Sequence, residues 1–248
     1  MAHPSASTRF RHSVDLKHVP RHLRVRARTA AHWLVSAEVL LVSKRMQPDQ
    51  DRTGVARGST LQSTLIRAID LVAAISGGVV TLPILLIVAF LVRLDSPGPA
   101  LFRQNRVGRN EVLFVCYKLR TMAEGAPVVG THEISVAHVT SIGRWLRRLK
   151  LDELPQLWNV IRGEMSLVGP RPCLPSQLEL IEARRAHGVY GVRPGVTGPS
   201  QVIGLDMSTP RELAEKDAIW ARAPNLKDYV RLIILTVLGK GQGDAILA

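Results

Sequence analysis

One uninterrupted apolar stretch limits what this chain can fold into more than any other feature. Residues 71–92 contain no charged side chain. At about 1.5 Å per residue, an α-helix of this length reaches roughly 33 Å, just enough to cross the hydrocarbon layer of a bilayer. The stretch also lacks a polar face, which disfavours a helix buried in a water-soluble core. The sequence therefore predicts a membrane-associated helix.

Two features favour a re-entrant form of this helix over a plain crossing. Pro83 lies in the middle of the stretch, where proline removes a backbone hydrogen bond and bends a helix. Basic residues, among them Arg67 and Arg93, flank both ends, and such residues prefer the cytoplasmic face. A helix that enters, breaks at Pro83 and leaves by the same face satisfies both flanks. We therefore expect a re-entrant membrane helix within residues 65–95, with a single crossing as the alternative.

The rest of the chain divides on either side of this helix. Residues 1–64 hold 11 Lys/Arg and 4 Asp/Glu, which is +7 of the formal net charge of +13. We interpret them as a basic, partly disordered extension, which is open to three roles: an arm on anionic lipid, a partner-binding segment or a solvated tail. Residues 96–248 are soluble in character and form the predicted catalytic domain, while the net charge calls for an anionic partner.

Local patterns predict a mostly helical α/β fold for this domain, with amphipathic surface helices. Residues 140–151 fit a helix, and 211–223 and 226–238 fit two more. Residues 112–117 fit a strand or a buried helical turn, and periodicity does not distinguish the two. The glycine- and proline-rich residues 192–198 suit close backbone approach to a ligand.

The adjacent carboxylates Asp152 and Glu153 are the strongest catalytic candidates. An acidic pair alone is a weak signal, because a solvated helix start explains it equally well. Pro155 is welcome in a first helical turn, so we expect a helix to begin at Asp152 or Glu153 and to end at Gly163. The dipole of that helix would hold Asp152 ionised. Nearby arginines match phosphate geometry, which indicates phosphoryl chemistry on an anionic substrate.

Other kinds of site are not evident in the sequence. Nothing resembles a Walker loop, a zinc-ligand spacing or a serine-nucleophile elbow. Cys116 and Cys173 are too few for a disulfide framework and are interpreted as ordinary thiols. Nucleic acid is not expected as a partner, because only 4% of residues are aromatic and base contacts need exposed rings or a recognition helix.

Four motifs make residues 66–239 resemble the bacterial sugar transferases. These are monotopic phosphoglycosyl transferases that initiate polysaccharide, O-antigen or glycoprotein glycan assembly. The motifs are Gln104-Asn105-Arg106 with Gly108, Tyr117-Lys118 with Arg120-Thr121-Met122, the block over residues 151–172, and the loop over residues 193–198. Two positions depart from the family pattern. Leu82 stands where members often carry a serine before the membrane proline, and Pro199 follows Gly198 where members often carry an aromatic residue.

The resemblance implies a reaction and a place for it. A UDP-sugar gives its sugar 1-phosphate to polyprenyl (undecaprenyl) phosphate and releases UMP. Asp152 is then the nucleophile that forms an aspartyl-phosphosugar intermediate, Glu153 is the supporting acid, and both belong to a Mg²⁺ site. The enzyme would lie at the bacterial inner membrane with its catalytic domain on the cytoplasmic face.

The same resemblance and the basic character of the motifs supply the expected substrate-binding residues. They are Arg106, Lys118, Arg120, Arg147, Arg171, Pro172 and Arg193. A second copy of the chain and the glycosyltransferases of later steps are candidate partners. Two rival hypotheses are a membrane-tethered nucleic-acid-binding module and a catalytically inactive scaffold of the same fold.

Overall fold

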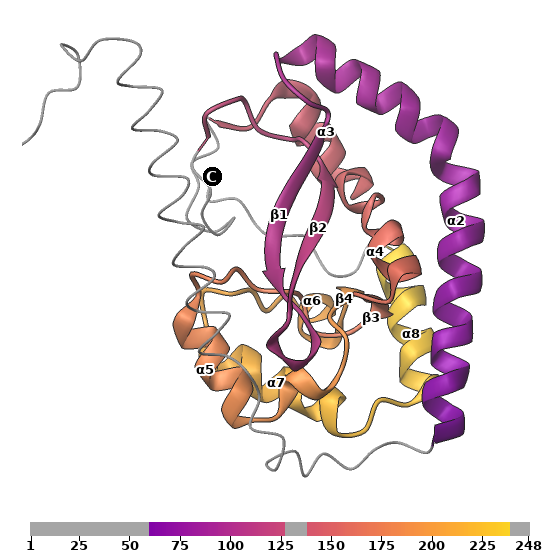
Figure 1. Cartoon of the computed structure of the whole chain (residues 1–248), viewed down its shortest axis with the longest axis vertical. Coiled ribbons are helices and arrows are strands. Elements are labelled where there is room, and N and C mark those ends of the chain that lie inside the picture. Colours follow the sequence, from indigo (N-terminus) through magenta and orange to yellow (C-terminus); the bar gives the residue numbers. More distant parts are fainter. Residues whose placement is uncertain (1–59, 127–137, 239–248) are drawn as a thin grey trace, which may run out of the picture. The chain divides into compact units, whose positions relative to one another are not determined.

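The computed structural model describes residues 60–126 and 138–238, whose elements are shown in Figure 1. The basic extension predicted over residues 1–64 lies almost entirely outside the described residues. The predicted mostly helical character of the α/β fold is confirmed for the described part. It holds two sheets of two strands each, and helices make up most of the rest.

The apolar stretch forms part of one long helix, α2 (Thr60–Asp95). In the part of the chain that the structure describes, this is the one helix long and apolar enough to cross a membrane. Pro83 lies inside it without ending it, and Figure 1 shows that the helix is bent. Ser76 and Thr81 donate from their hydroxyls to the carbonyls four residues earlier, each at 2.7 Å. The predicted break is thus a bend in a continuous helix, and re-entry into the membrane stays a prediction.

One side of α2 packs on the domain and the other is bare. Ala74, Val88 and Val92 are buried in two clusters of the core. Large apolar side chains cover the opposite side and are exposed along most of the helix. They include Val79, Val80, Leu82, Leu86, Ile87 and Phe90. Such a long exposed apolar face is what lipid contact requires of a helix.

The hairpin that follows α2 decides between the strand and the buried helical turn that the sequence leaves open for residues 112–117. Strands β1 (Leu101–Val107) and β2 (Leu113–Leu119) pair in antiparallel register, with Gln104 opposite Cys116 and Arg106 opposite Phe114. The segment over residues 112–117 is therefore a strand. The hairpin turns through Asn110 and Glu111, both at positive φ, inside the short helix η2 (Arg109–Glu111).

The acidic pair lies between two short helices. Helix α3 (Ser141–Arg148) begins at Thr140, whose hydroxyl caps Gly143 N–H at 3.0 Å. A single turn of 3₁₀-helix, η5 (Leu151–Glu153), then carries the pair. Helix α4 (Gln156–Arg162) follows and ends at Gly163, whose φ of 81° suits glycine. The predicted end is confirmed, but the predicted start is wrong, because the α-helix begins at Gln156.

The second sheet joins the block over residues 151–172 to the loop over residues 193–198. Strand β3 (Ser166–Val168) pairs in parallel with β4 (Gly195–Thr197). A Cβ on Gly195 would lie 2.1 Å from the backbone nitrogen of Gly169. At Gly195 the close backbone approach is made to Gly169. Approach of the loop to a ligand stays a prediction. Helix α8 (Leu226–Val237) packs against this sheet, and α5 (Leu178–Ala186) packs against α7 (Pro210–Arg222). The other elements of this part are η6 (Val189–Gly191) and α6 (Pro199–Val202).

A buried polar node joins the start of α2 to this sheet. Asp70 Oδ1 accepts hydrogen bonds from Leu167 N–H at 2.7 Å, the Tyr229 hydroxyl at 2.6 Å and the Ser166 hydroxyl at 3.0 Å. Arg67, one turn earlier, donates to the carbonyls of Val160 and Ile161 at the end of α4. The apolar helix is thereby fixed to α4, β3 and α8, all of which follow the acidic pair in the chain.

Candidate active site

A tight turn places the two carboxylates inside the domain. Lys150 adopts a left-handed conformation, with φ of 56° and ψ of 21°, and redirects the chain from α3 into η5. Asp152 is only 8% exposed, and the Glu153 side chain is 13% exposed. Neither carboxylate lies on a solvated helix start, so this explanation of the acidic pair is excluded.

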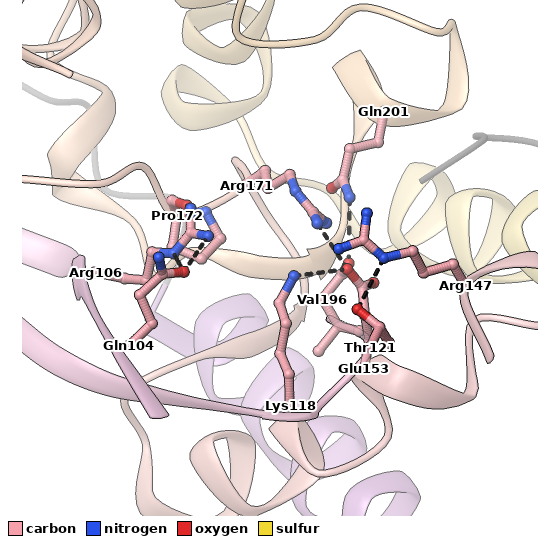
Figure 2. Close-up of polar contacts among 10 residues, drawn as sticks. All are labelled: Gln104, Arg106, Lys118, Thr121, Arg147, Glu153, Arg171, Pro172, Val196 and Gln201. Carbon is pink, nitrogen blue, oxygen red and sulfur yellow. Dashed lines mark hydrogen bonds and ion pairs between the residues drawn. The ribbon is translucent and has the colours of Figure 1, made fainter. Parts of the chain in front are cut away.

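Two cations from distant parts of the chain meet at Glu153. Lys118 Nζ, from β2, lies 3.2 Å from Glu153 Oε1, and Arg171 Nη2 lies 2.7 Å from the same oxygen. Figure 2 shows the three side chains converging, with Arg147 beside them. Arg147 Nε donates to the Thr121 hydroxyl at 2.9 Å. The structure thus brings three of the predicted substrate-binding cations to the acidic pair.

The electrostatic setting of Asp152 differs from the one its sequence position suggests. Burial raises the pKa of the Asp152 carboxyl, and the neighbouring Glu153 raises it further. Lys118, Arg147 and Arg171 lower it, and the net direction is upward. Asp152 lies in a 3₁₀ turn before α4 and not at the start of an α-helix as predicted, and desolvation is the largest influence on its pKa.

Arg106 and Pro172 meet beside this cluster rather than in it. Arg106 Nη1 donates to the Pro172 carbonyl at 2.9 Å, and its Nη2 donates to Gln104 Oε1 at 2.6 Å. Figure 2 shows this contact as a separate group next to Arg171. The first and third motifs are thus in direct contact through a backbone carbonyl.

Two other predicted substrate-binding arginines make contacts at the ends of helices. Arg120 donates to the carbonyls of Val92, Ser96 and Pro97 at the end of α2, at 3.2 Å from Val92 and 2.6 Å from Ser96. Arg193 Nε donates to the Gly163 carbonyl at 2.9 Å, at the end of α4. Burial and the nearby Arg67 lower the pKa of Arg193. Their substrate contacts stay predictions.

The profile of the family described as bacterial sugar transferase matches residues 61–240. The chain belongs to the bacterial sugar transferase family. This confirms the resemblance found in the motifs, and with it the expected class of enzyme, a transferase.

Three relatives illustrate the range of this sugar transferase family. UDP-glucose:undecaprenyl-phosphate glucose-1-phosphate transferase of Caulobacter vibrioides is 41% identical over 180 residues, or 67% of either chain. UDP-N-acetylgalactosamine-undecaprenyl-phosphate N-acetylgalactosaminephosphotransferase of Aeromonas hydrophila is 35% identical over 195 residues, or 76% of this chain and 46% of the relative. Exopolysaccharide production protein PSS of Rhizobium leguminosarum bv. phaseoli is 41% identical over 158 residues, 59% of this chain and 78% of the relative. The chain therefore spans less than half of the Aeromonas protein.

The acidic pair of this sugar transferase suits the Mg²⁺ ion that the family implies. Mg²⁺ takes oxygen ligands and is usually bound by one or two carboxylates together with substrate phosphates. Among the described residues, Asp152 and Glu153 supply two such carboxylates side by side, and both are largely buried. No group of three or more His, Cys, Asp or Glu side chains gathers in those same residues. Asp152 and Glu153 would therefore share the ion with substrate phosphates.

Sequence reasoning missed Asn159, which helps to shape the site of this sugar transferase. The Asn159 amide donates to the Val115 carbonyl and to Glu164, both at 2.7 Å, and its oxygen accepts from Tyr117 N–H. This ties α4 to β2, which carries Lys118. Nothing in the sequence singles out Asn159, because its burial and its contacts appear only in the tertiary structure.

Proposed function

We propose that this sugar transferase moves a sugar 1-phosphate from a UDP-sugar to undecaprenyl phosphate and releases UMP. The observation that carries the proposal is the buried Asp152 beside Glu153, which is itself bound by Lys118 and Arg171. The names of the Caulobacter and Aeromonas relatives support the same substrates. The product would be the first lipid-linked sugar of a polysaccharide or glycoconjugate.

The proposed reaction consists of two displacements at one phosphorus atom. In the first, an Asp152 oxygen attacks the β-phosphorus of the donor, the bond to the bridging oxygen breaks, and UMP leaves with that electron pair. In the second, a phosphate oxygen of the lipid attacks the same phosphorus and frees Asp152. Covalent catalysis of this kind divides one difficult transfer into two easier steps.

Charge is the main obstacle to the first step. A carboxylate about 4 Å from a phosphate oxygen is repelled by about 4 kcal/mol at an effective dielectric constant near 20. Lys118, Arg147 and Arg171 already lower the pKa of Asp152, so they favour its ionised, nucleophilic form. The same cations stabilise the negative charge that develops on the leaving phosphate. A Mg²⁺ ion bound by the acidic pair would add to this neutralisation of charge.

The roles of Glu153 and Arg171 follow from their contact. Glu153 holds both Lys118 and Arg171 by one oxygen, Oε1, so it sets where these two positive charges lie. Arginine donors match phosphate geometry, so in this proposal Arg171 also contacts a donor phosphate. In this proposal Asp152 reacts, while Glu153 orients the cations and shares the metal.

The membrane helix gives the reaction its location. The exposed apolar face of α2 and the basic residues at both of its ends support the proposed re-entrant insertion from the cytoplasmic face. The domain would then lie at the bacterial inner membrane, at the depth of the lipid headgroups, where the phosphate of the acceptor is found. Assembly with a second copy or with later glycosyltransferases stays a prediction.

A panel of UDP-sugars tests the proposal. Purified protein with Mg²⁺, undecaprenyl phosphate and each donor in turn should release UMP with at least one of them. Asp152→Asn should abolish this release while the protein stays folded, whereas Asp206→Asn, in a surface turn, should keep it. An Asp152→Asn variant with a near-normal rate would remove Asp152 as the nucleophile.

A further inference from the structure

The turn that carries Arg171 is held by two other arginines. Arg184 Nη1 donates to the Arg171 carbonyl at 2.8 Å, and Arg106 Nη1 donates to the Pro172 carbonyl at 2.9 Å. Successive carbonyls of one turn are thus fixed by side chains from α5 and from β1. The Arg171 side chain leaves the same turn toward Glu153 (Figure 2).

Arg184 is itself fixed by a buried chain of contacts. Its Nε and Nη2 donate to Asp217 Oδ2 at 3.1 and 2.6 Å, and the Ser200 hydroxyl donates to Asp217 Oδ1 at 2.6 Å. All three residues are buried, with Asp217 at 0% exposure. Burial lowers the pKa of Arg184, but the facing Asp217 raises it and the net direction is upward, so the arginine stays charged.

A buried ion pair such as Arg184–Asp217 is not explained by stability alone. Removing two charges from water is energetically unfavourable, and apolar replacements of a buried pair are often neutral or stabilising. The neighbouring Arg185 shows the ordinary alternative on the same helix. Its guanidinium pairs with both oxygens of Glu111 and remains 48% exposed. What distinguishes Arg184 is the third contact, to the backbone of Arg171.

We propose that Arg184, locked by Asp217, is a positioning residue that aims the Arg171 guanidinium at Glu153 and at the donor phosphates. It acts through the backbone of the turn and touches no substrate. The catalytic part of this inference rests on the proposed function. Its structural part, the fixed orientation of Arg171, does not.

The reactivity of Arg171 tests the structural part directly. Its side chain is only 10% exposed, so phenylglyoxal should modify it slowly in the wild-type protein. The variant pair Arg184→Met with Asp217→Asn removes both charges and keeps an acceptor for the Ser200 hydroxyl. Peptide mass spectrometry should show Arg171 modified several-fold faster in this variant. Arg185→Met with Glu111→Gln is the matched control and should leave the Arg171 rate unchanged.

Kinetics test the catalytic part on the same proteins. A small misplacement of a catalytic group can cost about 100-fold, so kcat/KM for the donor should fall roughly 10- to 100-fold in the Arg184→Met, Asp217→Asn protein. Arg184→Lys, which keeps the charge but loses the fork, should fall between this protein and the control. If the Arg184 variants match the control in both Arg171 reactivity and kcat/KM, the inference is overturned. Absence of UMP release from the wild-type protein with every donor would count against the proposed function instead, and the Arg171 rates would still decide the positioning role.

Should the double variant fail to fold, as shown by loss of its thermal transition, Arg184→Lys decides alone. A rise in Arg171 reactivity in this variant supports the positioning role, and an unchanged rate contradicts it.

Discussion

Replacing Asp70 by alanine tests how firmly the apolar helix is joined to the catalytic domain. The change leaves three donors without their acceptor: the hydroxyls of Ser166 and Tyr229 and the N–H of Leu167. Hydrogen bonds to a charged group contribute about 1.5 to 3 kcal/mol each, so the lower end gives about 4.5 kcal/mol for the three. One kcal/mol shifts the melting temperature of a domain of this size by roughly 2–4 °C. We therefore expect Asp70→Ala to melt about 9–18 °C below the wild type.

Thermal unfolding in detergent, followed by tryptophan fluorescence, measures this shift. Tyr229→Phe removes one of the three bonds and should lower the melting temperature by about 3–6 °C on the same scale. Asp206→Ala is the control, because its carboxylate accepts two hydrogen bonds from Ser208 in an exposed turn. If Asp70→Ala melts within about 3 °C of the wild type, the node does not fix α2 to the domain and the reasoning fails.

Two further predictions concern the site and the sheet beneath it. The pKa of Asp152 is raised, so UMP release should fall on acidification at a pH above the ordinary aspartate value of about 3.9, and Lys118→Met should move this fall to still higher pH. A pH–rate profile in which Lys118→Met leaves the acidic limb in place would contradict this. Folding favours the protonated Asp152, so its contribution to stability is full below the unfolded pKa and is lost as pH rises through the folded pKa. Gly195→Ala should lower the free energy of unfolding by about 1–3 kcal/mol, because the added Cβ would collide with the backbone of Gly169. Gly78→Ala in α2 is the control, since a Cβ there meets open space. Equal melting temperatures of the two variants would contradict this.

Sequence reasoning reached the features that local patterns and motifs encode. The end of α4 at Gly163 follows from glycine's freedom at positive φ, and the long helix follows from an uncharged stretch. The acidic pair and its partners Lys118 and Arg171 were found because their motifs carry the chemistry of a known family.

Other features depend on contacts that no local pattern shows. Lys118 and Arg120 are two residues apart and look alike in the sequence, yet Lys118 meets Glu153 and Arg120 meets the last carbonyls of α2. Long basic side chains reach whatever the fold places opposite them. In the sequence, Asp70 and Asp217 look like ordinary charged residues. Only the tertiary structure shows that both are buried.

The charge state of Asp152 shows how tertiary burial changes an inference from sequence. Placing it at a helix start suggested a carboxyl held ionised, whereas burial in the turn before α4 raises its pKa. The surrounding cations then become essential to the proposed reaction, because they favour the ionised form that desolvation opposes.

Intact-mass analysis after mixing with donor alone tests the central claim most directly. The wild-type protein, incubated with an active UDP-sugar and Mg²⁺ but no lipid and quenched rapidly in acid, should gain the mass of one sugar phosphate. Fragmentation should locate this mass on Asp152, and Asp152→Asn should gain none. UMP release that strictly requires lipid, with no added mass at any quench time, would contradict the account and show direct transfer between donor and acceptor.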